Sequence, residues 1–166
     1  MQDSSSITRR EFLGKSVALG AVGMAGQSLL SLPAYSAAAA SANDRIRLGF
    51  IGIGDRGKQD LDAFLNEPGA EITALCDVWK DHLDAAVAKC PAPPKTFHDY
   101  RELLASDLVD AVVIATPPHW HALQAIDACE AGKDFYLEKP MTLSVGESLA
   151  VLRAVRKRER ITQIGT

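Results

Sequence analysis

Between residues 45 and 166, short apolar runs alternate with longer segments in which apolar residues recur at helical spacing. The runs predict strands at residues 46–51, 71–76, 111–115, 134–137 and 161–164. The longer segments predict helices at residues 57–66, 80–89, 99–105, 119–131 and 144–158. The run Ala111–Ala115 is uninterrupted, which is typical of a strand covered on both faces. This alternation predicts an α/β fold in which helices cover both faces of a doubly wound parallel sheet.

The ends of several predicted helices carry ordinary capping residues. Asp99 with Glu102, and Ser144 with Glu147, have the spacing of a capping box. Residues 90–95 contain three prolines and predict a surface connection.

The first predicted strand runs directly into a glycine-rich turn and a helix, in the sequence IRLGFIGIGDRG of residues 46–57. A G-x-G-x-x-G pattern has meaning mainly in this context. Gly52 permits the tight turn, Gly54 lets the backbone approach a pyrophosphate, and Gly57 lets the helix pack on the strand. The free N–H groups at the start of that helix favour an anion. The pattern therefore predicts a Rossmann-type dinucleotide-binding sheet; the alternative is that the glycines only shape a loop.

The second predicted strand ends in Asp77, which lies 25 residues after Gly52. A carboxylate at this position accepts hydrogen bonds from an adenosine ribose and repels a 2′-phosphate, which favours NAD over NADP. Lys80 and Arg56 are close enough in sequence to leave NADP open. Arg56 itself either contacts the pyrophosphate or lies in solvent, and Asp77 has the alternative role of capping the next helix.

Residues 1–42 predict a targeting segment. Arg9 and Arg10 precede Phe-Leu and a weakly hydrophobic stretch rich in glycine, which resembles a twin-arginine export signal. Residues 40–42 fit an A-x-A cleavage site. An uncleaved membrane anchor is the alternative, but its glycines and Pro33 make the segment a poor spanning helix. We therefore expect a signal at residues 1–42, a nucleotide-binding domain at residues 43–166, a periplasmic or otherwise exported protein, and NAD held tightly because it is loaded before export.

Charge and cysteine content exclude several kinds of site. The chain has a formal net charge of −3 over 166 residues, and removal of a leader with three basic and two acidic residues makes it −4. A mildly acidic chain without a basic stripe predicts no nucleic-acid partner. Cys76, Cys90 and Cys129 have no C-x-x-C spacing, so we expect neither a metal site nor a redox dithiol.

Two segments follow later strands, where ligands bind in an open parallel sheet. Residues 116–121, TPPHWH, place aromatic and imidazole groups at the start of a helix, although His119 and His121 have the ordinary alternative of capping or packing. Residues 138–140, Glu-Lys-Pro, place Lys139 at a strand end, where it can serve as a hydrogen-bond donor or acid–base group for an alcohol. The alternative is a surface lysine paired with Glu138. His82 and His98 receive no role.

These motifs together resemble the Gfo/Idh/MocA oxidoreductases, the glucose–fructose oxidoreductase and inositol dehydrogenase type, over residues 45–166. The most specific part is EKP after DFYL, combined with TPPHWHA. The resemblance implies that Lys139 contacts the reacting hydroxyl and the nicotinamide region, and that Pro140 follows a cis bond. It implies nucleotide contacts from Gly52, Gly54, Gly57, Asp77, Thr116, Pro117, His121, Glu138, Lys139 and Pro140.

Members of this family continue into a second α/β domain that carries substrate contacts and much of the oligomer interface. We therefore expect this chain to be the nucleotide-binding part of a longer, oligomeric enzyme; the alternative is a solitary nucleotide-binding module. The leading hypothesis is an exported oxidoreductase that transfers a hydride between a secondary alcohol of a sugar, cyclitol or polyol and NAD. The competing hypothesis is a redox-neutral, NAD-dependent cleavage of a glycosidic bond, as in some relatives.

Overall fold

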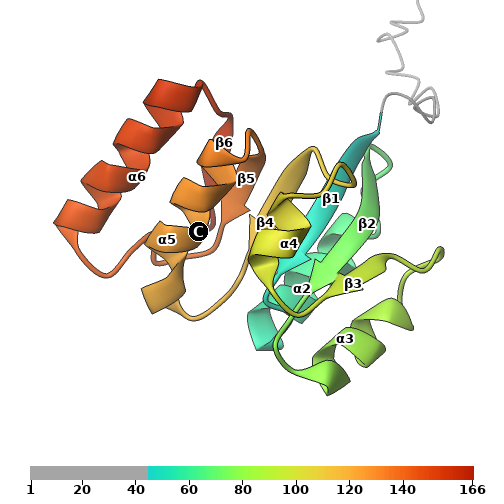
Figure 1. Cartoon of the computed structure of the whole chain (residues 1–166). Helices are drawn as coiled ribbons and strands as arrows, with labels where there is room; N and C mark the ends of the chain where they lie inside the picture. The colour runs from blue at the N-terminus through green and yellow to red at the C-terminus, as the bar shows by residue number, and fades with distance from the viewer. Residues whose placement is uncertain (1–44) are drawn as a thin grey trace, which may run out of the picture. The chain divides into compact units, whose positions relative to one another are not determined.

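A computed structural model describes residues 45–166 (Figure 1). The strands are β1 (Ile46–Ile51), β2 (Ala70–Cys76), β3 (Lys95–Phe97), β4 (Ala111–Ile114), β5 (Asp134–Leu137) and β6 (Thr162–Ile164). The helices are α2 (Asp55–Phe64), α3 (Lys80–Val87), α4 (Tyr100–Leu104), α5 (Pro118–Glu130) and α6 (Val145–Arg158).

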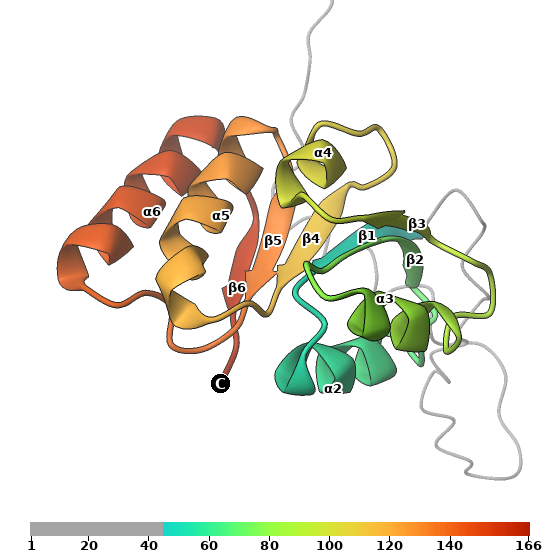
Figure 2. The same cartoon turned by 60° about the horizontal axis from the view of Figure 1, so that its bottom comes forward.

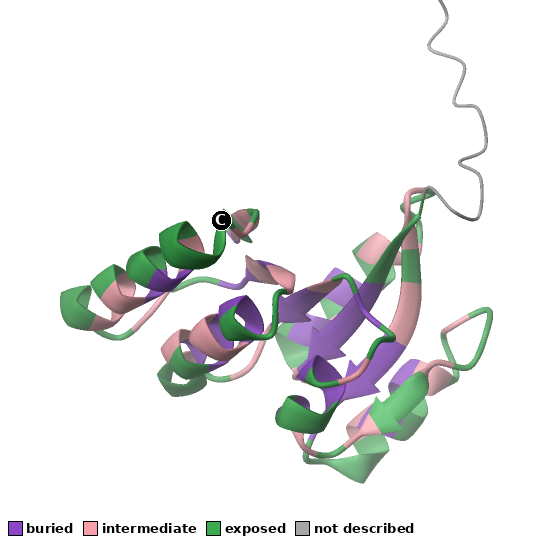
Figure 3. Ribbon diagram, turned by 45° about the horizontal axis from the view of Figure 1, so that its top comes forward, coloured by how far each residue is buried: buried purple, intermediate pink, exposed green. Residues whose placement is uncertain are grey.

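All six strands form one parallel sheet in the order β3-β2-β1-β4-β5-β6. One apolar cluster joins this sheet to α4, α5 and α6, and a second joins the other face to α2 and α3. Figure 2 shows α2 and α3 on the opposite side of the strands from α4. Figure 3 shows buried residues concentrated along the central strands. The doubly wound α/β prediction is confirmed, and the order of the strands reverses between β1 and β4, where such sheets bind ligands.

The boundaries of the predicted elements agree with the structure to within two residues, except for β3, which was not predicted. This strand has only three residues and pairs with β2 alone. It follows a segment with three prolines, which cannot donate to a sheet, so the sequence around it favours a loop.

The predicted capping residues behave differently at α4 and α6. Ser144 and Glu147 form the expected reciprocal capping box of α6. At α4, the Asp99 side chain accepts a hydrogen bond from the N–H of Arg101 and no reciprocal bond from Glu102 is found in the described part of the chain. The α4 helix spans five residues, and the Asp99 side chain satisfies the N–H of one of them, Arg101.

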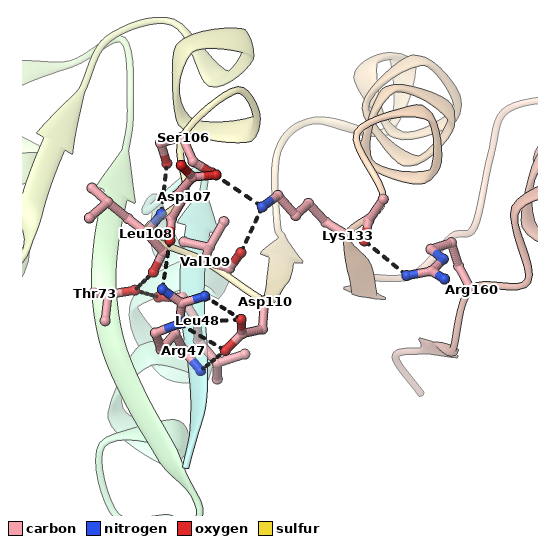
Figure 4. A network of polar contacts seen from close by, with 11 residues as sticks. Arg47, Leu48, Thr73, Ser106, Asp107, Leu108, Val109, Asp110, Lys133 and Arg160 are labelled. Atoms are coloured by element: carbon pink, nitrogen blue, oxygen red, sulfur yellow. Dashed lines mark hydrogen bonds and ion pairs between the residues drawn. The ribbon is translucent and has the colours of Figure 1, made fainter. Parts of the chain in front are cut away.

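The amino ends of the strands are joined by a polar network, shown in Figure 4. At the start of β1, Arg47 donates from Nε and Nη2 to the carboxylate of Asp110 at 3.0 and 2.5 Å, and from Nη1 to the carbonyl of Asp107 at 2.6 Å. Lys133 Nζ donates to the carbonyls of Ser106 and Val109 at 3.1 and 2.8 Å. The hydrogen bond from Arg47 holds the pKa of Asp110 below its ordinary value. The network therefore links the amino ends of the strands, which are the end of the sheet opposite the predicted ligand site.

The predicted export signal of residues 1–42 lies outside the residues that the structure describes. Within residues 45–166, no helix is both long enough and apolar enough to cross a bilayer. The same residues contain no group of three or more His, Cys, Asp or Glu side chains placed to hold a metal ion.

Candidate nucleotide site

The turn between β1 and α2 is shaped by two glycines that no other residue replaces without strain. Gly52 has a φ of +85°, and a Cβ at Gly57 would lie only 2.2 Å from the carbonyl oxygen of Gly52. Positive φ and close backbone approach are the conditions that require glycine. A Cβ at Gly54 would meet nothing nearer than a carbon of His82 at 3.9 Å, so the backbone above Gly54 is open. This cradle fits a pyrophosphate at the start of α2.

Asp77 lies directly beyond β2 and is 9% exposed. Its Oδ2 accepts a hydrogen bond from the N–H of Ile53 at 2.7 Å, and its Oδ1 accepts one from the N–H of Trp79 at 2.8 Å. His82 Nδ1 lies 3.3 Å from Oδ2. The carboxylate therefore fixes the glycine turn and the chain that enters α3, and its remaining lone pairs are available to ribose hydroxyls.

A cavity of about 600 Å³ opens between these segments, beyond the carboxyl ends of β1, β2 and β4. Five of the predicted site residues line it: Gly52, Gly54, Asp77, Thr116 and Pro117. The remaining predicted residues, which are Arg56, Gly57, His121, Glu138, Lys139 and Pro140, do not. The volume is within the range of small-molecule and cofactor sites.

The cavity also has lining residues that the sequence did not predict. They include aromatic and histidine side chains from the segment that leads into α3 and from the segment that leads into α4, namely Trp79, His82, His98 and Tyr100. Trp120, the aromatic residue of the TPPHWH segment in the first turn of α5, lines the cavity as well. His82 and His98 had been given no role. The position of His82, in the first turn of the helix after Asp77, is the signal that would have found it. Finding His98 required knowing that β3 exists.

Burial makes the one cysteine of the cavity unreactive. Cys76 is 3% exposed at the end of β2, and desolvation raises the pKa of its thiol to about 12. The thiolate is the nucleophilic form, so Cys76 is a neutral thiol at physiological pH. The chemistry of this site therefore does not depend on a cysteine nucleophile.

Beyond β5, Glu138 is buried and accepts hydrogen bonds from three donors. Arg56 Nε and Tyr136 Oη donate to Oε1 at 2.9 and 3.0 Å, and the N–H of Lys139 donates to Oε2 at 3.0 Å. Burial works to raise the pKa of Glu138, but these hydrogen bonds outweigh it and hold that pKa below its ordinary value. Glu138 is therefore a fixed anion.

Arg56 has carboxylate partners that the sequence did not predict. It forms ion pairs with Glu138 at 2.8 Å and Asp60 at 3.1 Å, and its side chain is 46% exposed. A contact of Arg56 with the pyrophosphate stays a prediction. The alternative that pairs Lys139 with Glu138 is not seen, because only the backbone N–H of Lys139 contacts that carboxylate. The Lys139 side chain is exposed and has no ion pair within residues 45–166.

His121 connects the turns after β4 and β5 from within the protein. It is 1% exposed, and its Nδ1 and Nε2 lie 2.8 Å from the carbonyl oxygens of Pro140 and Thr116. Both ring nitrogens thus face backbone carbonyls, and a contact of His121 with the cofactor stays a prediction. The bond between Lys139 and Pro140 is cis, as the resemblance implied.

The fold, the glycine cradle and the acid after β2 define a dinucleotide-binding domain, and comparison with known proteins identifies its family. The family described as "Oxidoreductase family, NAD-binding Rossmann fold" matches residues 46–166. The chain belongs to this Gfo/Idh/MocA family, and its cofactor class is NAD.

Similar proteins fall into two functional groups. A protein of Shewanella oneidensis named alpha-N-acetylgalactosaminidase is 38% identical over 123 residues, which are 69% of this chain and 27% of that protein. A glycosyl hydrolase family 109 protein of Shewanella putrefaciens is 36% identical over 125 residues, which are 70% of this chain and 27% of that protein. The solved scyllo-inositol dehydrogenase of Lactobacillus casei with bound NAD(H) and scyllo-inositol has a TM-score of 0.68 and 25% identity, covering 73% of this chain and 36% of that one. This chain thus spans about a quarter of the length of those curated relatives.

Proposed function

We propose that this chain is the nucleotide-binding part of an enzyme that acts on a sugar or cyclitol, and that Lys139 meets the hydroxyl of that substrate. The observation that carries the proposal is the position of these groups at the carboxyl ends of the strands. The glycine cradle and Asp77 lie on one side of the turn after β4, and the only exposed charged group of the Glu-Lys-Pro turn lies on the other.

Bound NAD supplies a hydride acceptor for the carbon of a secondary alcohol. The residues of the chain would divide the remaining work. The turn around Gly52 and Gly54 would hold the pyrophosphate, and Asp77 would accept hydrogen bonds from the adenosine ribose. Lys139 would donate a hydrogen bond to the alcohol oxygen and favour loss of its proton. Glu138 cannot take that proton readily, because three donors already hold its carboxylate as an anion.

We further propose that the complete reaction cleaves a glycosidic bond without net oxidation. The support is the set of curated relatives named glycosyl hydrolase family 109, one of them an alpha-N-acetylgalactosaminidase. A net dehydrogenase remains the second candidate, supported by the inositol dehydrogenase with bound NAD(H). Both candidate reactions require residues 45–166 to bind NAD and to present Lys139 to the substrate.

The first test is nucleotide binding, and the chain has a built-in probe for it. It contains two tryptophans, and both Trp79 and Trp120 line the cavity. NAD titrated into the 166-residue chain should change the tryptophan fluorescence saturably. The variant Gly54→Ala should weaken this binding at least about tenfold, because a methyl group occupies the open space above the cradle. No saturable change with the wild-type chain would contradict the proposal.

The second test separates the two candidate reactions. The protein that carries this chain is incubated with an α-N-acetylgalactosaminide and, separately, with a cyclitol, and products are followed by NMR and by absorbance of NADH. Released sugar without net NADH supports glycoside cleavage, whereas an oxidised cyclitol with equivalent NADH supports the dehydrogenase.

Export and tight retention of NAD are proposed together, from the arginine pair and the hydrophobic stretch within residues 1–42. A protein that is folded and loaded before export should keep its nucleotide through extensive dialysis. Complete loss of nucleotide under those conditions would contradict tight retention.

A further inference from the structure

Arg56 lies in the first turn of α2, inside the glycine turn of the nucleotide cradle, and its guanidinium extends to the turn after β5. Its Nε and Nη2 both bind Glu138 Oε1, at 2.9 and 2.8 Å. Nη2 also lies 3.1 Å from Oδ1 of Asp60, one helical turn further along α2. The guanidinium is thus held between a residue of its own helix and a residue 82 positions away in the sequence.

Asp60 fixes the direction of that guanidinium. Its side chain is buried, its Oδ1 is paired with Arg56, and its Oδ2 has no hydrogen-bond partner among residues 45–166. Burying a carboxylate is costly unless the charge is paired. Arg56 therefore compensates the buried charge of Asp60, and Asp60 in return anchors the guanidinium on α2. The helix backbone and Asp60 together determine where the guanidinium meets Glu138.

Glu138 connects the guanidinium to the backbone of Lys139. The two oxygens of the Glu138 carboxylate have different partners. Oε1 accepts from Arg56 and from Tyr136 Oη, whereas Oε2 accepts from the backbone N–H of Lys139 at 3.0 Å. A carboxylate is a rigid planar group, so a displacement of Oε1 also displaces Oε2. The N–H of Lys139 is thus tied to the first turn of α2 through one buried carboxylate.

The end of β6 packs against this carboxylate from a third side. A Cβ at Gly165 would lie 2.7 Å from both Glu138 Oε1 and Tyr136 Oη, which is closer than Cβ contacts in real proteins. The N–H of Gly165 donates to the carbonyl oxygen of Leu137 at 2.8 Å, so the backbone there is held as well. The Glu138 carboxylate therefore has no room to turn toward β6 and keeps its contact with Arg56.

We propose that Arg56 is a positioning residue, which fixes the backbone of Lys139 through the carboxylate of Glu138. In this role Arg56 needs no contact with the substrate. The functional part, that a correctly placed Lys139 is required for turnover, rests on the proposed function. The geometric part, that Arg56 fixes the Lys139 backbone, does not depend on it.

The geometric part is tested by NMR of the ¹⁵N-labelled 166-residue chain without nucleotide. Arg56→Met removes the guanidinium and keeps an unbranched side chain, and it should shift the backbone amides of Lys139 and Gly165. The matched control is Arg47→Met. The Arg47 side chain is 45% exposed, against 46% for Arg56, and it pairs with Asp110 at the opposite end of the sheet. This control should leave both amides unmoved.

The functional part is tested in the protein that carries this chain, at saturating NAD. Arg56→Met should lower kcat about a hundredfold, which is the order of loss that a displacement of roughly 1 Å causes. The KM for substrate and the Kd for NAD should stay within about twofold of wild type, because only the transition state needs the exact position of Lys139. A loss of stability alone would not separate kcat from KM in this way.

A second variant displaces the same carboxylate without removing any charge. In Gly165→Ala the new methyl group has to push Glu138 Oε1 or Tyr136 Oη aside. It should shift the Lys139 amide and lower kcat, although Arg56 is intact. If Arg56→Met does not fold, Gly165→Ala decides by the same two measurements.

Three results would overturn the proposal. An unmoved Lys139 amide in Arg56→Met would show that Arg56 does not fix this backbone. A moved amide with unchanged kcat would show that the position it fixes does not matter for turnover. Weaker NAD binding with full turnover at saturating NAD would assign Arg56 to the pyrophosphate. Failure of the proposed function looks different, because the wild-type protein would then show no NAD-dependent turnover, while the amide shifts still decide the geometric part.

Discussion

We expect replacement by alanine to have opposite effects at Gly57 and Gly54 of the nucleotide cradle: loss of stability at Gly57, and loss of NAD binding at Gly54. A Cβ at Gly57 would lie 2.2 Å from the carbonyl oxygen of Gly52, whereas real Cβ contacts are essentially never below 3.0 Å. Gly57→Ala therefore forces α2 and the turn apart by at least 0.8 Å, and both sides of this contact are backbone, which adjusts poorly. At Gly54 the nearest atom would be 3.9 Å away, so Gly54→Ala fits the folded protein.

The expected cost of Gly57→Ala is about 3 kcal/mol, the upper end for overpacking a close-packed site. For a domain of this size, that lowers the melting temperature by roughly 10 °C. Gly54→Ala should melt within about 2 °C of wild type and yet bind NAD weakly, because its methyl group occupies space that the pyrophosphate needs. Stability is measured by thermal and urea unfolding followed by circular dichroism, and binding by tryptophan fluorescence.

Comparing Gly57→Ala with Gly54→Ala distinguishes an effect on folding stability from an effect on NAD binding. Equal stability of the two variants would show that α2 does not pack as closely on the turn as the structure indicates. Normal NAD binding by Gly54→Ala would show that the pyrophosphate does not lie over this cradle, even if the stabilities came out as expected.

Three further predictions follow from the polar contacts. Glu138→Gln should lower the free energy of unfolding at pH 7 by about 2 kcal/mol, because it removes the charge that holds three donors. Since the folded pKa of Glu138 is lowered, its contribution is present above the unfolded carboxyl pKa of about 4.3 and is lost as the pH falls through the folded value, so the difference between variant and wild type should shrink in urea titrations below pH 4. Asp77→Asn should narrow the preference for NAD over NADP about tenfold in fluorescence titrations, since the amide no longer repels a 2′-phosphate; an unchanged ratio would assign the preference elsewhere. Arg47→Met should cause a small loss of thermal stability that 1 M NaCl abolishes, because the pair with Asp110 is half-exposed; a loss that persists in salt would indicate a packing role.

Sequence reasoning succeeded where the signal is local. Each long strand is an uninterrupted or alternating apolar run, and the glycine turn and Asp77 stand at fixed distances from the strand ends. It failed at β3, where three residues beside prolines form a strand only because β2 offers a free edge. Since β3 was missed, the segment after it, with His98 and the first residue of α4, Tyr100, was not recognised as part of the ligand edge.

The contacts around the Glu-Lys-Pro turn show a second limit of prediction from sequence, which is that contacts between distant residues leave no local signal. Arg56 and Glu138 are 82 residues apart, and nothing in the local sequence of either predicts that they meet. His121 is different, because its spacing from Gln124, Ala125 and Ala128 already indicates a buried face of the helix. The sequence analysis gave packing as the alternative for His121, and the buried ring agrees with that alternative, while its contact with the cofactor stays a prediction.

The structure thus gives the two charged residues of the Glu-Lys-Pro turn separate tasks. Glu138 is buried with three donors, so its carboxylate has little capacity left for chemistry and instead ties the turn to the glycine loop through Arg56. Lys139 is exposed and contributes only its backbone to that cluster, which leaves its side chain free for the substrate contact that we propose. Replacing Lys139 with methionine should accordingly leave folding and NAD binding within about twofold of wild type while abolishing turnover by the protein that carries this chain. Loss of NAD binding by Lys139→Met would instead assign the lysine to the nucleotide.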